Sequence, residues 1–214
     1  MRLVLPRLYV ILDAALIPSP ERDCAASLAE AGVRLLQYRN KSVSARQYLE
    51  SSRELAETLV PRGVSFFVND RPDVAFLAGA SGVHVGQEDL DVEQTRRVVG
   101  RDRLVGVSTH NLEQFDCAAT SSADYIAVGP IFGTSSKANP DPVVGLAFLR
   151  RVRGLTEKPI VAIGGITLER AAGAIEAGAD SVAVISGILS AADPAQRARQ
   201  YITTLEAAKH AAAF

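Results

Sequence analysis

The stretch PIVAIGGITLERAAGAIEAGADSVAVISGI, residues 159–188, decides the fold class of this chain. It opens with a nearly continuous apolar run, Pro159–Ile163, which is typical of a strand covered on both faces. A helical pattern follows, starting at Thr167 and stopping at Gly178, where glycine favours the end of a helix. A second apolar run, Ser181–Ile185, closes the stretch. A strand, a helix and a strand in this order predict a parallel βα repeat.

The same repeat extends over the rest of the chain. Six further strand candidates precede it: Arg7–Leu12, Arg34–Tyr38, Ser65–Val68, Gly82–Val85, Leu104–Val107 and Tyr125–Val128. Eight strands alternating with eight helices, without a Gly/Ser linker, favour a single (β/α)8 TIM barrel over residues 1–214. An open doubly wound sheet could be written from the same units, but it usually has only about five or six strands.

Local signals place several helix boundaries. In the first helix Ser19 is the expected N-cap, Pro20 the first helical residue, and Gly32 follows the end. The second helix opens with the capping-box sequence Ser44–Gln47, and the eighth starts at Asp193-Pro194. These caps support the assignment of helices between the strands.

Composition excludes several classes of protein. The chain has 23 basic and 24 acidic residues, a formal net charge of −1, which argues against a nucleic-acid-binding protein. No apolar stretch approaches the roughly 20 residues of a membrane span, and Pro6 and Arg7 interrupt the only apolar N-terminal run. We therefore expect a cytoplasmic protein. Its two cysteines, Cys24 and Cys117, have no CxxC spacing and are expected as small buried helix residues.

Polar residues gather where the predicted strands end, which is where barrels of this type build active sites. Gln37, Arg39 and Lys41 follow the second strand. Arg39 and Lys41 are two residues apart, so both point the same way on an extended chain. Two cations and an amide suit phosphate oxygens, although an ordinary solvated pair of cations would look the same in sequence.

Two carboxylates end the next strands. Asp70 follows Asn69 at the end of the third strand, and Asp89 lies one βα unit further on. Carboxylate and amide oxygens are ligands that Mg²⁺ accepts beside water and phosphate. Asp70 alone could instead cap the following helix, and Glu88 and Asp91 compete with Asp89 as ligands.

The remaining strand ends carry hydroxyls, a lysine and glycines. Ser108 follows the fifth strand, and a long loop, Gly129–Gly145, follows the sixth. That loop contains Thr134, Ser135, Ser136 and Lys137, a phosphate-binding composition that lacks the Walker spacing. Small residues after the seventh and eighth strands suit a second phosphate or tight packing. The histidines, His84, His110 and His210, show no metal-ligand spacing and are interpreted as structural or surface residues.

Seven ordered segments resemble the thiamine-phosphate synthase family. They are LYVILD (8–13), LLQYRNK (35–41), FFVNDRPDVAFLAGASGVHVGQEDL (66–90), VGVSTHN (105–111), ADYIAVGPIFGTSSK (123–137), IVAIGGI (160–166) and GADSVAVISGI (178–188). The resemblance implies an enzyme that joins 4-amino-2-methyl-5-hydroxymethylpyrimidine diphosphate to a thiazole phosphate, releasing diphosphate and giving thiamine phosphate.

The resemblance also implies the site residues. The Mg²⁺ ligands would be Asp70 and Asp89, and the catalytic cations Arg39, Lys41 and Lys137. The pyrimidine diphosphate would be bound by Gln37, Tyr38, Arg39, Asn40, Lys41, Asn69, Ser108 and Lys137. The thiazole phosphate would be held by Thr134, Ser135, Ser136, Gly165, Ile185 and Ser186. Two positions depart from the commonest family pattern: Asn40 stands where glutamate is frequent, and Ser136 where threonine is frequent.

Other interpretations stay open at this stage. A related tautomerase of the thiazole resembles the chain in outline, but carries a histidine where Pro130 stands here. A non-catalytic phosphate-ligand-binding barrel, or an isomerase of a sugar phosphate, would use the same glycines and leave the paired carboxylates unexplained. The expected partners are small-molecule substrates, and the sequence leaves a homodimer open.

Overall fold

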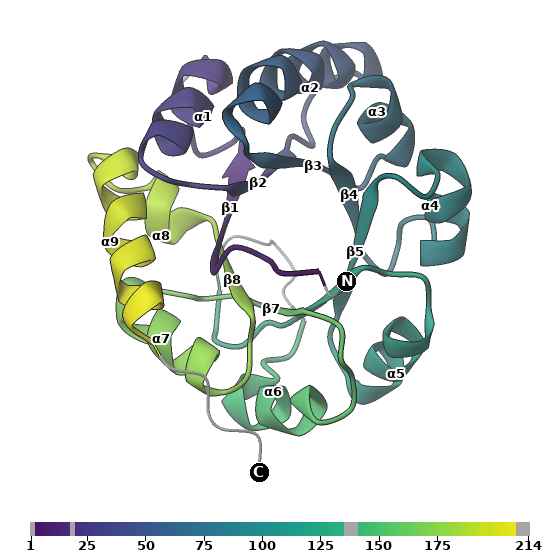
Figure 1. Cartoon of the computed structure of the whole chain (residues 1–214), viewed down its shortest axis with the longest axis vertical. Coiled ribbons are helices and arrows are strands. Elements are labelled where there is room, and N and C mark those ends of the chain that lie inside the picture. The colour runs from purple at the N-terminus through teal and green to yellow at the C-terminus, as the bar shows by residue number, and fades with distance from the viewer. Residues whose placement is uncertain (1–2, 18–19, 135–140, 209–214) are drawn as a thin grey trace.

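The strands of this protein close into a parallel barrel, in the order in which they occur along the chain. The structure is a computed structural model that describes residues 3–17, 20–134 and 141–208. Figure 1 looks along the barrel, with the strands inside a ring of helices. The strands are β1 Leu8–Asp13, β2 Leu35–Arg39, β3 Ser65–Asn69, β4 Gly82–Val85, β5 Leu104–Thr109, β6 Tyr125–Val128, β7 Ile160–Ile163 and β8 Ser181–Val184.

A helix follows each strand and covers the outer face of the barrel (Figure 1). The helices are α1 Glu21–Glu30, α2 Ala45–Leu59 with a 3₁₀ turn at Val60–Arg62, α3 Pro72–Leu77, α4 Val92–Val99, α5 Leu112–Thr120, α6 Gly145–Arg153, α7 Leu168–Glu176, α8 Ser186–Leu189 and α9 Pro194–Ala207. The predicted (β/α)8 barrel is confirmed. That this one domain occupies all of residues 1–214 stays a prediction, because four short segments are outside the described residues.

Most predicted helix boundaries agree with the structure. The capping box at Ser44 and Gln47 forms, and Asp193 accepts a hydrogen bond from the backbone N–H of Gln196. The predicted start of the first helix is wrong: Pro20 is the N-cap, with an extended backbone, and the helix begins at Glu21. The four-residue helix α8 was not predicted, because the eighth strand was expected to lead directly to the helix at Asp193-Pro194.

Side chains alternate between the inside and the outside of the barrel. On β1, Tyr9 and Ile11 belong to the inner cluster, whereas Val10 and Leu12 pack against the helices. Such alternation is the period of an extended strand, and it builds two separate apolar layers. The inner cluster consists of Leu5, Tyr9, Ile11, Leu35, Phe67, Tyr125, Ala127, Val161 and Ala183.

Aromatic rings fill the inside of the barrel. Tyr9, Phe67 and Tyr125 meet edge to face, with ring centroids 5.7 to 6.1 Å apart. Gly82 and Gly106 make room for them, since a Cβ at Gly82 would overlap the Phe67 ring and a Cβ at Gly106 the Tyr125 ring. The packed aromatic layer is therefore the floor on which a cavity at the carboxyl end of the strands can rest.

The opposite end of the barrel is closed by the chain itself. The segment before β1 crosses the barrel opening in Figure 1, and Leu5 from that segment is buried in the inner cluster. The open end is consequently the one at the carboxyl termini of the strands.

The structure also tests what was expected of the two cysteines and of membrane spans. Cys24 on α1 is partly buried, but Cys117 on α5 is exposed, so the expectation of a buried residue is wrong for Cys117. Among the described residues, no helix combines the length and the apolar character that crossing a bilayer requires.

Candidate functional site

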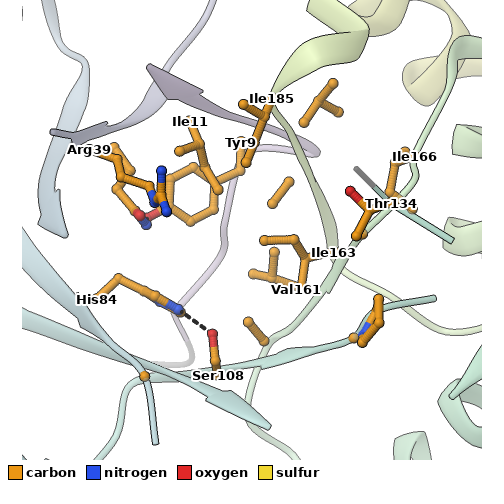
Figure 2. A pocket seen from close by; sticks show the side chains of 18 of the residues that line it. Tyr9, Ile11, Arg39, His84, Ser108, Thr134, Val161, Ile163, Ile166 and Ile185 are labelled. Carbon is orange, nitrogen blue, oxygen red and sulfur yellow. Dashed lines mark hydrogen bonds between the residues drawn. The ribbon is translucent and has the colours of Figure 1, made fainter. Parts of the chain in front are cut away.

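A cavity of about 750 Å³ opens at the carboxyl ends of the strands. Every strand of the barrel contributes to its lining, and Figure 2 shows side chains from several of them converging on it. The predicted site residues that line it are Gln37, Arg39, Lys41, Asn69, Asp70, Asp89, Ser108, Thr134, Gly165, Ile185 and Ser186. Residues spread over some 150 positions of sequence thus meet around one space.

Five predicted site residues are not placed there. Tyr38 is fully buried in the outer apolar layer, where its hydroxyl donates to Glu21 at 3.1 Å, and Asn40 donates to the same hydroxyl. Neither residue lines the cavity, so substrate binding by Tyr38 and Asn40 stays a prediction that this placement does not support. The physical reason is strand alternation, which turns Tyr38 away from the face that Gln37 and Arg39 share. Ser135, Ser136 and Lys137 lie outside the described residues.

Arg39 is held by a carboxylate that the sequence analysis did not single out. β1 and β2 pair in parallel with Asp13 opposite Arg39, and the two side chains form an ion pair. Asp13 is 5% exposed, and its other oxygen accepts from the backbone N–H of Ala15 at 3.1 Å. A buried, anchored carboxylate restricts the guanidinium to one position at the cavity wall.

Asp70 and Asp89 face each other across the ends of β3 and β4. The backbone N–H of Asp70 donates to the carbonyl of His84 at 2.8 Å, which ties the two strand ends together. Asp70 adopts a positive φ of 63°, and its carboxylate lies 3.2 Å from the Lys41 ammonium. Asp89 accepts from the backbone N–H of Gly86 at 2.7 Å. Burial raises the pKa of the Asp89 carboxyl and the Asp70 carboxylate adds to the rise, whereas the Gly86 amide opposes it.

These two carboxylates fit a divalent cation. Burial is the main cause of the raised pKa of Asp89, and the like charge of Asp70 adds to it. A divalent cation between the two carboxylates would remove that repulsion. Within the described residues there is no cluster of three or more His, Cys, Asp or Glu side chains that could hold a metal alone. The donor set therefore suits a hard ion that takes only one or two carboxylates and completes its shell with water and phosphate, as Mg²⁺ does.

The floor of the cavity carries a continuous hydrogen-bond chain. Gln37 Nε2 donates to the Tyr9 hydroxyl at 2.8 Å, and the Tyr9 and Tyr125 hydroxyls are 3.0 Å apart. The Tyr125 hydroxyl lies 2.8 Å from His84 Nδ1, and His84 Nε2 lies 2.8 Å from Ser108 Oγ (Figure 2). Burial lowers the pKa of His84 to about 4, so its imidazole is neutral near pH 7. The expectation that His84 is a satisfied structural histidine agrees with these contacts, but the residue also lines the cavity.

Glycines form the opposite wall, after β7 and β8. Gly164 and Gly165 have φ values of 95° and 62°, which L-residues rarely adopt. A Cβ on Gly164 would overlap Pro130, and one on Gly165 would overlap the carbonyl oxygen of Gly133. A Cβ on Gly187 would overlap the hydroxyl of Tyr201. Backbone thus replaces side chains on this wall, which leaves room for a ligand phosphate near main-chain groups.

Sequence reasoning missed several residues of the cavity wall. These include Tyr9 and His110, which contacts the carbonyl of Gly129 at 2.7 Å and Asp141 at 3.5 Å. Asp13, which holds Arg39 from behind the wall, was also missed. Arg170, in the first turns of α7, lines the cavity with its guanidinium 4.8 Å from the centre of the Phe132 ring. Position at a strand end was the available signal for Asp13 and His110. No sequence signal was available for Tyr9, because its role depends on which strands become neighbours in the barrel.

Comparison with known proteins identifies the family of this chain. The family model described as thiamine monophosphate synthase matches residues 8–188. The chain belongs to the thiamine monophosphate synthase family. Thiamine-phosphate synthase of Koribacter versatilis is 54% identical over 208 residues, covering 95% of this chain and 97% of that protein. The protein of the same name from Chloroflexus aurantiacus is 45% identical, covering 91% of this chain and 90% of that protein. The chain is accordingly a transferase of thiamine biosynthesis, as its resemblance predicted.

Solved structures give the same family and show how widely the fold is shared. Thiamine phosphate pyrophosphorylase from Pyrococcus furiosus superposes with a TM-score of 0.85 at 32% identity, covering 94% of this chain and 96% of that one. A 3-hexulose-6-phosphate synthase from Salmonella typhimurium has a TM-score of 0.71 at 21% identity, covering 95% of this chain and 100% of that one. The second likeness shows the fold alone, since one barrel can carry many chemistries.

Proposed function

We propose that this cavity performs the condensation of the thiamine monophosphate synthase family with the residues described above. The substrates are 4-amino-2-methyl-5-hydroxymethylpyrimidine diphosphate and a thiazole phosphate, and the products are thiamine phosphate and diphosphate. The observation that carries the proposal is the meeting of Asp70 and Asp89 with Arg39 and Lys41 on one wall of the cavity. Two carboxylates and two cations in one wall suit a metal-bound diphosphate better than a single phosphate monoester.

In the proposed reaction the bond between the pyrimidine methylene carbon and the diphosphate oxygen breaks first. The electron pair leaves with the diphosphate, and the electron-rich aminopyrimidine delocalises the positive charge that remains. Arg39, fixed by Asp13, and Lys41 lie where negative charge grows on the leaving group. Preorganised cations in a partly enclosed site stabilise such charge more than water does. We assign Lys137 the same role from its sequence position.

We propose Mg²⁺ as the ion that Asp70 and Asp89 hold, where it would neutralise the diphosphate and assist its departure. Asn69, which lines the cavity beside Asp70, adds an amide to the same wall. Lys41 is well exposed and bonded to Asp70, so its ammonium can turn from the carboxylate to a diphosphate oxygen.

The ring nitrogen of the thiazole then attacks the pyrimidine methylene carbon. No nucleophile from the protein is needed, because the attacking atom belongs to a substrate. We propose that Thr134, Gly165, Ile185 and Ser186, together with Ser135 and Ser136, hold the thiazole phosphate on the glycine-lined wall. Holding both partners in one cavity can contribute on the order of 7 kcal/mol or more through proximity.

The location and the assembly of the enzyme are two further proposals. We place the enzyme in the cytoplasm, because both proposed substrates are phosphate esters whose charges keep them on one side of a membrane. We also retain the homodimer, which sedimentation of the purified protein at assay concentrations tests. A single species with the mass of one chain would contradict it.

Product formation from the two substrates tests the proposed function. Purified protein is assayed with Mg²⁺, then with EDTA, and then with Mg²⁺ restored in excess. We expect thiamine phosphate and diphosphate in equal amounts, loss of both with EDTA, and recovery afterwards. No product from a folded protein that still binds the thiazole phosphate by calorimetry would favour a tautomerase or a non-catalytic binder. Equal turnover with and without EDTA would contradict the proposed role of Mg²⁺.

A further inference from the structure

A hydrogen-bond chain crosses the barrel floor and joins five strands. It runs in the order Gln37 (β2), Tyr9 (β1), Tyr125 (β6), His84 (β4) and Ser108 (β5). The two tyrosines are at most 1% exposed, and Gln37 and His84 are 2% and 7% exposed. The His84 and Tyr125 rings lie nearly parallel, 23° apart, which holds the imidazole in its plane. Only the two ends of this chain, Gln37 and Ser108, belong to the predicted substrate-binding set.

The first of these hydrogen bonds has a fixed direction, and the others can be assigned from it. An amide nitrogen can only donate, so Gln37 Nε2 gives a hydrogen to Tyr9, whose hydroxyl accepts it. Tyr9 carries a single hydrogen, and its other partner in the chain is the Tyr125 hydroxyl. If Tyr9 donates this hydrogen to Tyr125, then Tyr125 donates to His84 Nδ1. A neutral imidazole has one N–H, and with Nδ1 accepting, that N–H is on Nε2 and points at Ser108 Oγ.

Both ends of this hydrogen-bond chain consequently present a defined group to the cavity. Gln37 Nε2 donates one of its two hydrogens to Tyr9, which anchors the amide and lets its carbonyl oxygen accept from a ligand that donates a hydrogen. The Ser108 oxygen is occupied by the His84 N–H, which leaves the hydroxyl hydrogen for a ligand that accepts one. Both residues line the cavity. A ligand that fits must therefore offer a donor beside β2 and an acceptor beside β5.

We propose that the buried chain of Tyr9, Tyr125 and His84 sets the polarity of the substrate pocket, with Gln37 as acceptor and Ser108 as donor. The three buried residues are positioning residues, because they act on the ligand through Gln37 and Ser108. This inference rests on the proposed function for the identity of the ligand: the exocyclic amino group of the aminopyrimidine is the donor, and an oxygen of its diphosphate is the acceptor.

The charge of the site favours this direction over the reverse. In the reverse chain Ser108 would donate to His84 Nε2 and turn oxygen lone pairs toward the cavity. Ser108 lies in the same cavity as Arg39 and Lys41, which suit an anion, and lone pairs facing an anion repel it.

The protonation state of His84 is the most direct test. The whole enzyme is labelled with ¹⁵N at its histidines, and the resonances of His84 are assigned by their absence in His84→Gln. At neutral pH, without substrate, we expect one neutral form with the hydrogen on Nε2. A neutral ring with its hydrogen on Nδ1, or a mixture of both neutral forms, would overturn the proposal. This measurement needs no turnover, so it decides the inference even where no product is formed.

Tyr125→Phe interrupts the hydrogen-bond chain at its centre, because the substitution removes the hydroxyl oxygen and keeps the aromatic ring. In this variant we expect the His84 hydrogen to divide between both nitrogens. The KM for the pyrimidine diphosphate should rise about tenfold, the scale of one or two lost hydrogen bonds. The KM for the thiazole phosphate should stay within about twofold, because its residues lie on the opposite wall.

Tyr201→Phe is the matched control. It also removes one buried phenol, whose hydroxyl donates to the carbonyl of Ile166 at 3.2 Å on the outer side of the barrel. Both variants should lose similar stability, whereas only Tyr125→Phe should change the His84 tautomer and separate the two KM values. Equal KM effects on both substrates in Tyr125→Phe, or no effect on either, would make Tyr125 a structural residue and overturn the proposal.

Discussion

The two walls of the cavity work by opposite means. The charged wall, formed by Arg39, Lys41, Asp70 and Asp89, acts through side chains that end in the open cavity. The glycine wall, formed by Gly164, Gly165 and Gly187, acts through the absence of side chains, because a Cβ there would overlap neighbouring atoms. A substitution on the charged wall therefore removes chemistry and spares packing, whereas one on the glycine wall disturbs packing first.

Asp70→Asn should give the largest effect and separates activity from stability most clearly. We expect turnover to fall by about 10³-fold, because the variant loses a metal carboxylate. The free energy of unfolding should change by less than about 1 kcal/mol, since asparagine tolerates the positive φ of 63° at this position. Product formation at saturating Mg²⁺ and chemical denaturation measure the two quantities.

Asp73→Asn is the control for Asp70→Asn, because Asp73 is an exposed carboxylate three residues away and pairs with Arg71. Its turnover should match the wild type. Near wild-type turnover of Asp70→Asn would contradict the metal assignment and with it the distinction between the two walls.

Gly165→Ala should, in contrast to Asp70→Asn, affect stability first. We expect a loss of about 3 kcal/mol of stability, from the left-handed φ of 62° and from overlap of the new Cβ with Gly133 and Phe132. Gly173→Ala within α7 is the matched control: its Cβ would meet nothing within 4 Å, and it should gain up to about 1 kcal/mol. Thermal and urea unfolding of both variants provide the comparison. An unchanged stability of Gly165→Ala would show that this wall can move.

His84, on the cavity floor between the two walls, should make the stability of the protein depend on pH. Burial in the folded protein lowers the pKa of His84 to about 4, below its ordinary value of 6.5, so the unfolded chain binds the proton more readily. His84 should therefore contribute full stability above about pH 6.5 and lose up to about 3 kcal/mol as the pH falls toward 4. Urea unfolding in EDTA measures this, and the curve for His84→Gln should fall less steeply. Parallel curves would contradict a buried neutral imidazole.

The smallest effect is expected outside the cavity. Arg71 and Asp73 form an exposed pair that lowers the pKa of Asp73, mainly through the hydrogen bond from Arg71. Exposed pairs of this kind contribute about 0 to 1 kcal/mol, so Arg71→Gln should change stability by less than 1 kcal/mol and leave turnover unaltered. A clear loss of turnover would show that the charged wall continues beyond the cavity to Arg71.

The strands were predictable because each is a short, nearly continuous apolar run. The predicted strand Tyr125–Val128 matches β6, and the observed β8 ends one residue before the predicted Ile185. The start of α1 at Glu21 was not predictable from local signals, since Pro20 is compatible with either the N-cap or the first turn. Tyr38 was placed in the site with its neighbours, although strand alternation turns its side chain into the outer layer.

By itself the sequence determined the fold class and the chemistry of the strand ends. Apolar periodicity and helix caps are local properties, and carboxylates, cations and glycines keep their chemical character wherever the chain places them. The tertiary structure alone decided which residues support them. Asp13 meets Arg39, and Tyr9 meets Tyr125, through the pairing and closure of strands far apart in sequence. Such contacts depend on strand register and on which side of each strand faces inward, which no local pattern records.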